Sequence, residues 1–221
     1  MTKGFIILIS MLVFICGYGQ DQTLEIKSLQ EKYNNLETEL INIGNKIDGK
    51  ILEYDINEII GLGLPTEDYI IHKSYVLSYS EKHEQAKWTA HILNPRVKKL
   101  GSKRTNDFRL DPLVTTSTAD STDYFHYEIT TKKYSTYGYD RGHLVPSADF
   151  RWNKDAMSDT YYYSNISPQR PEFNRGIWGE LENYCRAHVI AKDTELYCYN
   201  IPVFGDDSTI KESVNDVAIP A

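Results

Sequence analysis

Cysteine is scarce in this sequence, the net charge is not positive, and long apolar runs and internal repeats are missing. With 221 residues, the chain is long enough for one ordinary domain with additional segments and too short for two full domains. With a net charge of −7, the protein is not basic overall, which excludes the class of nucleic-acid-binding proteins that rely on a high positive net charge. The 41% of hydrophobic residues nevertheless predicts a packed core rather than disorder.

The longest apolar run, FIILISMLVFIC, has only twelve residues, whereas a membrane-spanning helix needs ~20. It follows Lys3 and precedes the small residues of GYG, which is the pattern of a secretory signal peptide. We predict a signal peptide at residues 1–19 and an exported, periplasmic or secreted protein with no stable membrane insertion after cleavage. A lipoprotein anchor at Cys16 is disfavoured because bulky residues, Phe14 and Ile15, precede it.

Cleavage would leave two cysteines, Cys185 and Cys198. In an oxidising compartment they could form one disulfide, and the alternative is two buried thiols. The sequence does not decide between them.

Residues 20–50 carry a heptad pattern that predicts an amphipathic helix ending near Gly49. It could form a short coiled coil that makes a homo-oligomer through residues 26–47, or it could pack on its own domain. Residues 51–70 then read as a linker at the start of a domain over 51–221. The apolar positions are Ile26, Leu29, Tyr33, Leu36, Leu40, Ile43 and Ile47.

Within that domain, YIIHKSYVLSYSE and AKWTAHILN favour two strands of a hairpin, separated by charged residues. DYFHYEITT and TELYCYNIPVF are typical of further strands, and residues 174–190 have helical spacing. Strands around one well-defined helix predict an α+β domain.

Two motifs carry the chemistry. The first, YDRGHLVPSADF, places Asp140, Arg141, Gly142 and His143 side by side. Alone it could be an ion pair and a turn glycine. The second, SNISPQRPEFNRGIWGELENYCR, supplies an asparagine, a glutamate and an arginine on one predicted helix: Asn174, Glu182 and Arg186.

Helical spacing lets these side chains act together, because Asn174 and Glu182 are two turns apart and Glu182 and Arg186 are four residues apart. Each has a simpler interpretation: Asn174 is also a natural helix N-cap, and Glu182 with Arg186 could be an exposed pair. The basic strip RVKKLGSKR, with five basic residues and no acid, could face a polyanion or could be a solvated loop.

The two motifs, with WTAHIL and the Arg104–Pro112 segment, resemble the DNA/RNA non-specific endonuclease family (Serratia nuclease and endonuclease G type) within the ββα-metal nucleases. The resemblance covers about Gly63 to Phe204. It implies a ββα-metal nuclease fold in which an antiparallel sheet is flanked by a catalytic helix.

The resemblance also implies roles for single residues. His143 matches the general base that activates water, which suits an imidazole with an ordinary pKa of about 6.5. Asn174 matches the residue that binds the divalent metal, Mg²⁺ or in its place Mn²⁺, and a single neutral oxygen ligand suits a hydrated cation. Glu182 matches an acid that orients a water on the metal.

Arg104 matches an arginine that contacts the phosphate and offsets transition-state charge, and Arg186 falls where the family has a second arginine on the helix. Asp140, Arg141, Gly142 and Asn165 are interpreted as supports around these groups. The expected function is a Mg²⁺-dependent endonuclease that hydrolyses DNA and RNA and leaves 5′-phosphate ends, recognising phosphates rather than bases.

Two other functions remain open: a catalytically silent nucleic-acid-binding protein of this fold, and a phosphodiesterase acting on a smaller substrate. The chain ends at NDVAIPA, where members of the family usually continue, so we expect a domain shortened at its C-terminus. An open sheet edge would then reduce stability.

Overall fold

The protein is described by a computed structural model, in which residues 20–99, 101–204, 213–214 and 217–220 are placed. The chain divides into two compact units, one up to Ile47 and one from Asp48 onwards. The predicted signal peptide, residues 1–19, lies outside the described residues. Among the helices of the described part, none combines the length and the apolar character needed to cross a membrane.

Helix α1 runs from Gln20 to Leu62 and does not stop at Gly49, so the prediction of a helix end there and of a linker beginning at residue 51 is wrong. Glycine inside a helix costs only ~1 kcal/mol relative to alanine. The next turns bury Leu52, Ile56 and Ile59, and each such side chain contributes ~1.5–3 kcal/mol. Burial therefore outweighs the glycine and extends the helix.

In the N-terminal unit, the heptad side chains of α1 are exposed to solvent. The exposed set is Ile26, Leu29, Tyr33, Leu36, Leu40, Ile43 and Ile47. A coiled coil through these positions stays a prediction.

The second unit is built on a four-stranded antiparallel sheet with the order β1-β2-β3-β8. The strands are β1 (Ile70–Ile71), β2 (Val76–Ser80), β3 (Gln85–Leu93) and β8 (Leu196–Asn200). The predicted hairpin is confirmed as β2 and β3, which pair Val76 with Ala90 and shift register at a bulge near Ser78.

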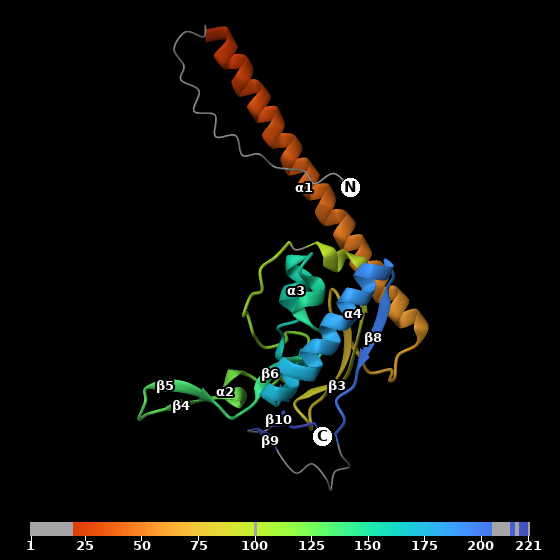
Figure 1. The fold of residues 1–221 in the computed structure, drawn as a ribbon, viewed down its shortest axis with the longest axis vertical. Helices are drawn as coiled ribbons and strands as arrows, with labels where there is room; N and C mark the ends of the chain where they lie inside the picture. The colour runs from red at the N-terminus through yellow and green to blue at the C-terminus, as the bar shows by residue number, and fades with distance from the viewer. Residues whose placement is uncertain (1–19, 100, 205–212, 215–216, 221) are drawn as a thin grey trace. The chain divides into compact units, whose positions relative to one another are not determined.

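The two faces of β3 bury different sets of side chains, as expected for alternation along a strand. Trp88 and Ile92 pack with Ile56 of α1, whereas Leu93 packs with Val189 of helix α4 (Gly179–Lys192). Figure 1 shows α4 running beside β3 and β8. The sheet is thus covered on both faces, and the predicted α+β class is confirmed.

Shorter elements connect this framework. They are η1 (Pro95–Lys98), α2 (Ser121–Tyr124), β4 (Phe125–Glu128), β5 (Lys133–Thr136), β6 (Asp140–His143), η2 (Ser147–Phe150), α3 (Lys154–Asp159), η3 (Tyr163–Asn165), β7 (Ile166–Gln169), η4 (Phe173–Trp178), β9 (Ser213–Val214) and β10 (Val217–Ala218).

Candidate active site

The strand β6 consists of the four motif residues Asp140–His143 and pairs with β7 in antiparallel register. The chain then enters η4, a π-helical segment that leads directly into α4. Two strands followed by a helix are the arrangement implied by the resemblance. The predicted helix over residues 174–190 is confirmed, although its first turn is wider than an α-helix because Gly176 has non-helical dihedral angles.

His143 lies at the end of β6 opposite Ile166 and is only 8% exposed. Aromatic rings surround it: the Tyr161 ring meets it edge-on at 4.8 Å between centroids, and the Phe108 ring lies at 5.5 Å. Burial lowers the pKa of His143, Arg104 and Arg141 lower it further, and the result is about 3. The imidazole is therefore neutral at neutral pH. Its Nε2 has no hydrogen-bond partner among the described residues.

Asp140, at the start of the same strand, binds two residues of η4. Its Oδ2 accepts a hydrogen bond from Asn174 Nδ2 at 2.9 Å and another from Arg175 Nε at 2.8 Å. Burial acts to raise the pKa of Asp140, but the hydrogen bonds from Arg175 and Asn174 outweigh it and lower the pKa. Because the carboxylate only accepts, it fixes the amide of Asn174 with Nδ2 towards Asp140 and leaves Oδ1 free. Asn174 is thus not the helix N-cap.

Asp149, in η2, connects the other end of the motif to α4. Its Oδ1 accepts a hydrogen bond from Arg186 Nη1 at 2.7 Å, and its Oδ2 lies 3.1 Å from His91 Nε2. Burial acts to lower the pKa of His91, but Cys198 and Asp149 raise it, and the net shift is upward. A protonated His91 and Arg186 together balance the buried carboxylate of Asp149.

The predicted pair of Glu182 and Arg186 is present and is not an exposed pair. Arg186 Nη2 lies 3.4 Å from Glu182 Oε2, and side-chain exposure is 14% and 20% respectively. Burial raises the pKa of Glu182, Arg186 lowers it, and the net shift is upward. Glu182 is therefore largely buried and lies beside the guanidinium of Arg186.

The motif and the helix are consequently joined at two points. Asp140 binds Asn174 at the beginning of η4, and Asp149 binds Arg186 in α4. His143 lies between the two aspartates in the chain. These contacts attach the strand that ends in His143 to the helix that carries Asn174, Glu182 and Arg186.

Two further predicted supports hold the backbone around His143. A Cβ on Gly142 would lie 2.1 Å from Gln169 Cδ, so glycine leaves room for the buried Gln169 side chain, which a larger residue would displace. Asn165 is fully buried; its Oδ1 accepts from Val145 N at 2.9 Å and its Nδ2 donates to Thr160 O at 2.9 Å. Asn165 thereby fixes the chain that follows His143.

Two arginines reach this region from different segments. Arg104 is exposed and donates from Nε to the Tyr161 hydroxyl at 3.2 Å, next to His143. Arg141 lies with its guanidinium carbon 3.6 Å from the centroid of the Phe108 ring. Arg141 is thus committed to aromatic packing, whereas Arg104 presents its charge to solvent.

The cysteines do not form a disulfide. Cys185 and Cys198 are free thiols, each half-buried, so of the two alternatives the structure has the unpaired one. Both pack with Leu93 between α4 and the sheet, where apolar contacts rather than a covalent bond join the two elements.

Sequence reasoning missed Asp149, Arg175 and His91. Asp149 belongs to the quoted motif, and Arg175 directly follows Asn174, so both were within reach as charged neighbours of the assigned residues. His91 lies in the continuously buried part of β3 and gave no signal beyond a structural histidine.

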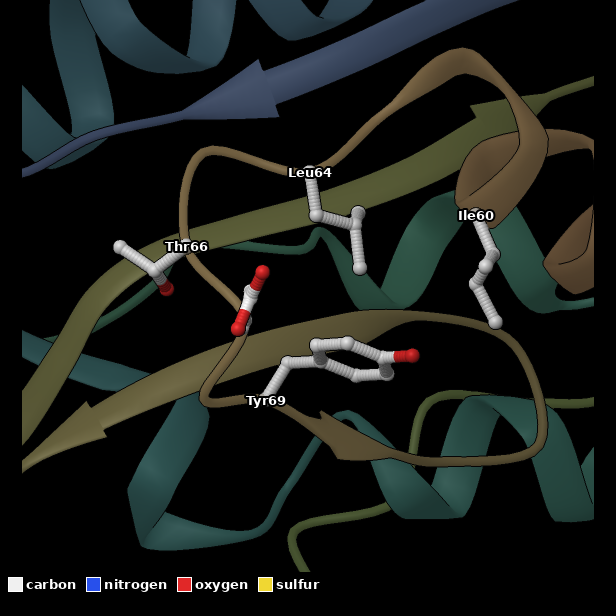
Figure 2. A pocket seen from close by; sticks show the side chains of 5 residues that line it. Ile60, Leu64, Thr66 and Tyr69 are labelled. Carbon is white, nitrogen blue, oxygen red and sulfur yellow. The ribbon is translucent and has the colours of Figure 1, made fainter.

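A separate shallow pocket of about 290 Å³ lies near the end of α1, and Figure 2 shows its lining side chains. Ile60, Leu64, Thr66, Glu67 and Tyr69 line it, so its surface is both polar and apolar. It contains none of the predicted site residues.

The described residues contain no cluster of three or more histidine, cysteine, aspartate or glutamate side chains suited to a metal. The free Oδ1 of Asn174 fits a different case, a hydrated hard cation that takes one protein oxygen.

Comparison with known proteins gives a consistent result. Residues 56–221 match the family model for DNA/RNA non-specific endonucleases. Human mitochondrial endonuclease G is 40% identical over 158 residues, covering 67% of this chain and 50% of the relative. Zebrafish mitochondrial nuclease EXOG is 35% identical over 136 residues, covering 59% and 37%.

A solved structure of the EndoG/EndoGI complex matches with a TM-score of 0.59 and 26% identity, covering 75% of this chain and 69% of that chain. The fold class predicted from the motifs is therefore confirmed. The chain spans about half the length of the curated relatives it matches.

These relatives also correct one prediction. Proteins from human, cattle, zebrafish, frog and fission yeast that match this chain are mitochondrial nucleases. That finding overturns the prediction of an exported, periplasmic or secreted protein, which rested on residues 1–19 alone.

Proposed function

Since the chain belongs to the DNA/RNA non-specific endonuclease family, we propose that it cleaves phosphodiester bonds of DNA and RNA with a divalent cation, Mg²⁺ or Mn²⁺. The observation that carries the proposal is the pair of contacts, Asp140–Asn174 and Asp149–Arg186, that attach the segment on either side of His143 to η4 and α4. In the proposed site, His143 supplies a neutral imidazole, Asn174 an amide oxygen and Glu182 a carboxylate.

His143 acts as the base. Its neutral form is fully populated at neutral pH because burial and the two neighbouring arginines disfavour the imidazolium. A ring nitrogen takes the proton of a water molecule as that water attacks phosphorus. The surrounding rings of Tyr161 and Phe108 keep the imidazole in one orientation.

Asn174 holds the cation through Oδ1, because Asp140 occupies Nδ2. A bound divalent cation supplies Lewis-acid stabilisation of negative charge on the phosphate and the departing 3′-oxygen. Glu182 accepts hydrogen bonds from water at this position, and Arg186 keeps its carboxylate in place.

Arg104 contacts the scissile phosphate and offsets the charge that builds up during cleavage. It is suited to this role because it is exposed and adjoins His143 through Tyr161. Arg186, by contrast, already contacts Asp149, Glu182 and Asn183, so it acts by positioning. Contacts to phosphate without contacts to base edges account for action on both DNA and RNA.

The exposed heptad positions of α1 assemble the protein through a coiled coil. Residues 26–47 present isoleucine, leucine and tyrosine at steps of three and four, and these side chains are exposed in the single chain. A second copy of the chain is the partner that supplies the same stripe.

The test is digestion of plasmid DNA and of a structured RNA with Mg²⁺, with EDTA, and by the variant His143→Ala. We expect both substrates to be cut to 5′-phosphate ends only with the cation, and His143→Ala to lose ~10²–10⁴-fold in rate. His188→Ala is the matched histidine control and keeps the wild-type rate. Intact substrates at saturating Mg²⁺ would refute the nuclease function, whereas undiminished cutting by His143→Ala would refute only the role of the base.

A further inference from the structure

The β4–β5 hairpin has no role in the mechanism above, yet it is joined directly to the candidate active site. In Figure 1 it extends away from the sheet of its own unit, beside α2. β5 ends at Thr136, and β6 with its catalytic motif begins four residues later at Asp140. A two-stranded hairpin is only marginally stable in water. Exposed apolar side chains on such a hairpin therefore indicate a surface that binds another molecule.

The hairpin exposes a pair of tyrosines. Tyr127 and Tyr134 are direct cross-strand partners, with ring centroids 5.2 Å apart in an edge-to-face arrangement. They are 51% and 74% exposed, and Ile129 at the turn is 84% exposed. The pairing fixes the two rings relative to each other and leaves aromatic surface open.

The face that carries these tyrosines continues to His143. Phe125 lies two residues before Tyr127 on the same face of β4, because side chains alternate along a strand. The guanidinium carbon of Arg141 lies 4.8 Å from the Phe125 ring centroid and 3.6 Å from that of Phe108. Phe108 in turn packs against His143. A row of rings and one cation thus connects the hairpin to the active site.

The charge of the hairpin differs from that of the whole chain. Residues 125–137 contain two lysines, Lys132 and Lys133, and one acid, Glu128, so their formal balance is 2 − 1 = +1, against −7 for the chain. Aromatic faces next to lysines are the composition that binds a polyanion with unpaired bases. A protein partner would not require the lysines.

We propose that the hairpin Phe125–Thr136 binds single-stranded nucleic acid by stacking unpaired bases on Tyr127 and Tyr134. This inference rests on the proposed nuclease function and assigns a substrate class to it. In a duplex the base faces are covered by neighbouring pairs, so the tyrosines favour single strands and unpaired ends. Every base has a π-face, which keeps the binding independent of sequence and of the sugar.

The tyrosines lie within reach of a strand bound at the active site. Tyr134 lies six residues before Asp140, which is at most ~20 Å of extended chain. At 3.4 Å per base step, a single strand of about six stacked nucleotides spans that distance. An oligonucleotide of about 20 residues is therefore long enough to contact both.

The experiment compares the full chain with the double variant Tyr127→Ala, Tyr134→Ala. Binding to labelled single strands is measured by fluorescence anisotropy in EDTA, where no cutting interferes. On an oligonucleotide of about 20 residues we expect about tenfold weaker binding. On blunt duplexes of DNA and of RNA, in which the base faces are covered, we expect binding within about twofold of the wild type. The double variant Tyr127→Phe, Tyr134→Phe keeps the rings and retains binding, and Tyr54→Ala controls for loss of an exposed tyrosine.

Equal binding of the long single strand by the alanine variant and the wild type would overturn the proposal, and so would an equal loss on all three ligands. A change of mass in light scattering with unchanged binding would assign the hairpin to a protein interface and overturn it as well. Failure of the nuclease function is recognised separately, because it shows as uncut plasmid and RNA in the wild type with Mg²⁺.

Discussion

The side-chain amide of Asn174 donates to the carboxylate of Asp140 at 2.9 Å, and this single bond decides which atom of Asn174 is free. An amide at position 140 can donate as well as accept, so it no longer selects one orientation of the Asn174 side chain.

The variant Asp140→Asn should therefore lower the affinity for the divalent cation by about 10- to 100-fold, which is the usual effect of removing a residue that orients a metal ligand. The measurement is cutting rate against Mg²⁺ concentration, and the expected result is a curve shifted to higher Mg²⁺ with the maximal rate largely recovered. Arg175→Ala, which removes a more exposed partner of Asp140, should shift the curve little. A normal curve for Asp140→Asn would show that the orientation of Asn174 does not depend on this bond.

Asp149 balances two buried cations, and removing its charge should destabilise the domain. For Asp149→Asn we expect a loss of about 3 kcal/mol in the free energy of unfolding, because buried His91 loses its carboxylate partner and Arg186 keeps only Glu182. Urea unfolding followed by circular dichroism measures it. Asp155→Asn, in an exposed pair with Lys73, is the control and should lose almost nothing. An unchanged midpoint of unfolding for Asp149→Asn would contradict the role of Asp149 as the carboxylate that stabilises buried His91 and Arg186.

Asp55 predicts a dependence of stability on pH. Burial raises its pKa to about 7, although the hydrogen bond from Asn94 opposes the rise. Between the ordinary carboxyl pKa and about 7 the folded protein holds a proton that the unfolded chain releases, so this residue makes stability fall as pH rises through that window.

Asp55→Asn should remove that contribution and make the variant relatively more stable above pH 7. Unfolding in urea at about pH 5 and about pH 8 gives the two free energies to compare. Asp68→Asn, at an exposed aspartate, controls for the loss of one charge. The same difference between the two pH values in wild type and Asp55→Asn would rule out Asp55 as its source.

The heptad positions of α1 give a prediction about mass. The full chain should appear in light scattering as a multiple of the single chain, and Leu29→Asp with Leu36→Asp should reduce it to the monomer, because charges at core positions cannot be buried in a coiled coil. Lys27→Asp alters charge outside the stripe and should leave the mass unchanged. A monomeric wild type would reject the oligomer.

The local placement of the motif residues could be predicted from the sequence because they lie in two short segments, whereas their chemical roles stay proposals. Asp140–His143 form one strand, and Glu182 and Arg186 are one helical turn apart, so local spacing alone placed them. The hairpin of β2 and β3 followed in the same way from alternating side chains and a charged turn.

What the sequence could not provide depends on long-range packing. The continuation of α1 past Gly49 requires the sheet face on which Ile56 and Ile59 pack. The partnership of Asp149 with His91 joins residues 58 positions apart, and no local pattern marks it. Export was predicted from twelve apolar residues without any contact to the fold, and that prediction was wrong.

The kink at Gly176 has a consequence for the phase of the helix. In a continuous α-helix, eight residues place Asn174 and Glu182 about 80° apart around the axis. Gly176 lies between them with non-helical dihedral angles, φ −100° and ψ −115°, so helical spacing does not set the direction of Asn174 relative to α4. The backbone at Gly176 sets it instead, and is as much a part of the site as the identity of its side chains.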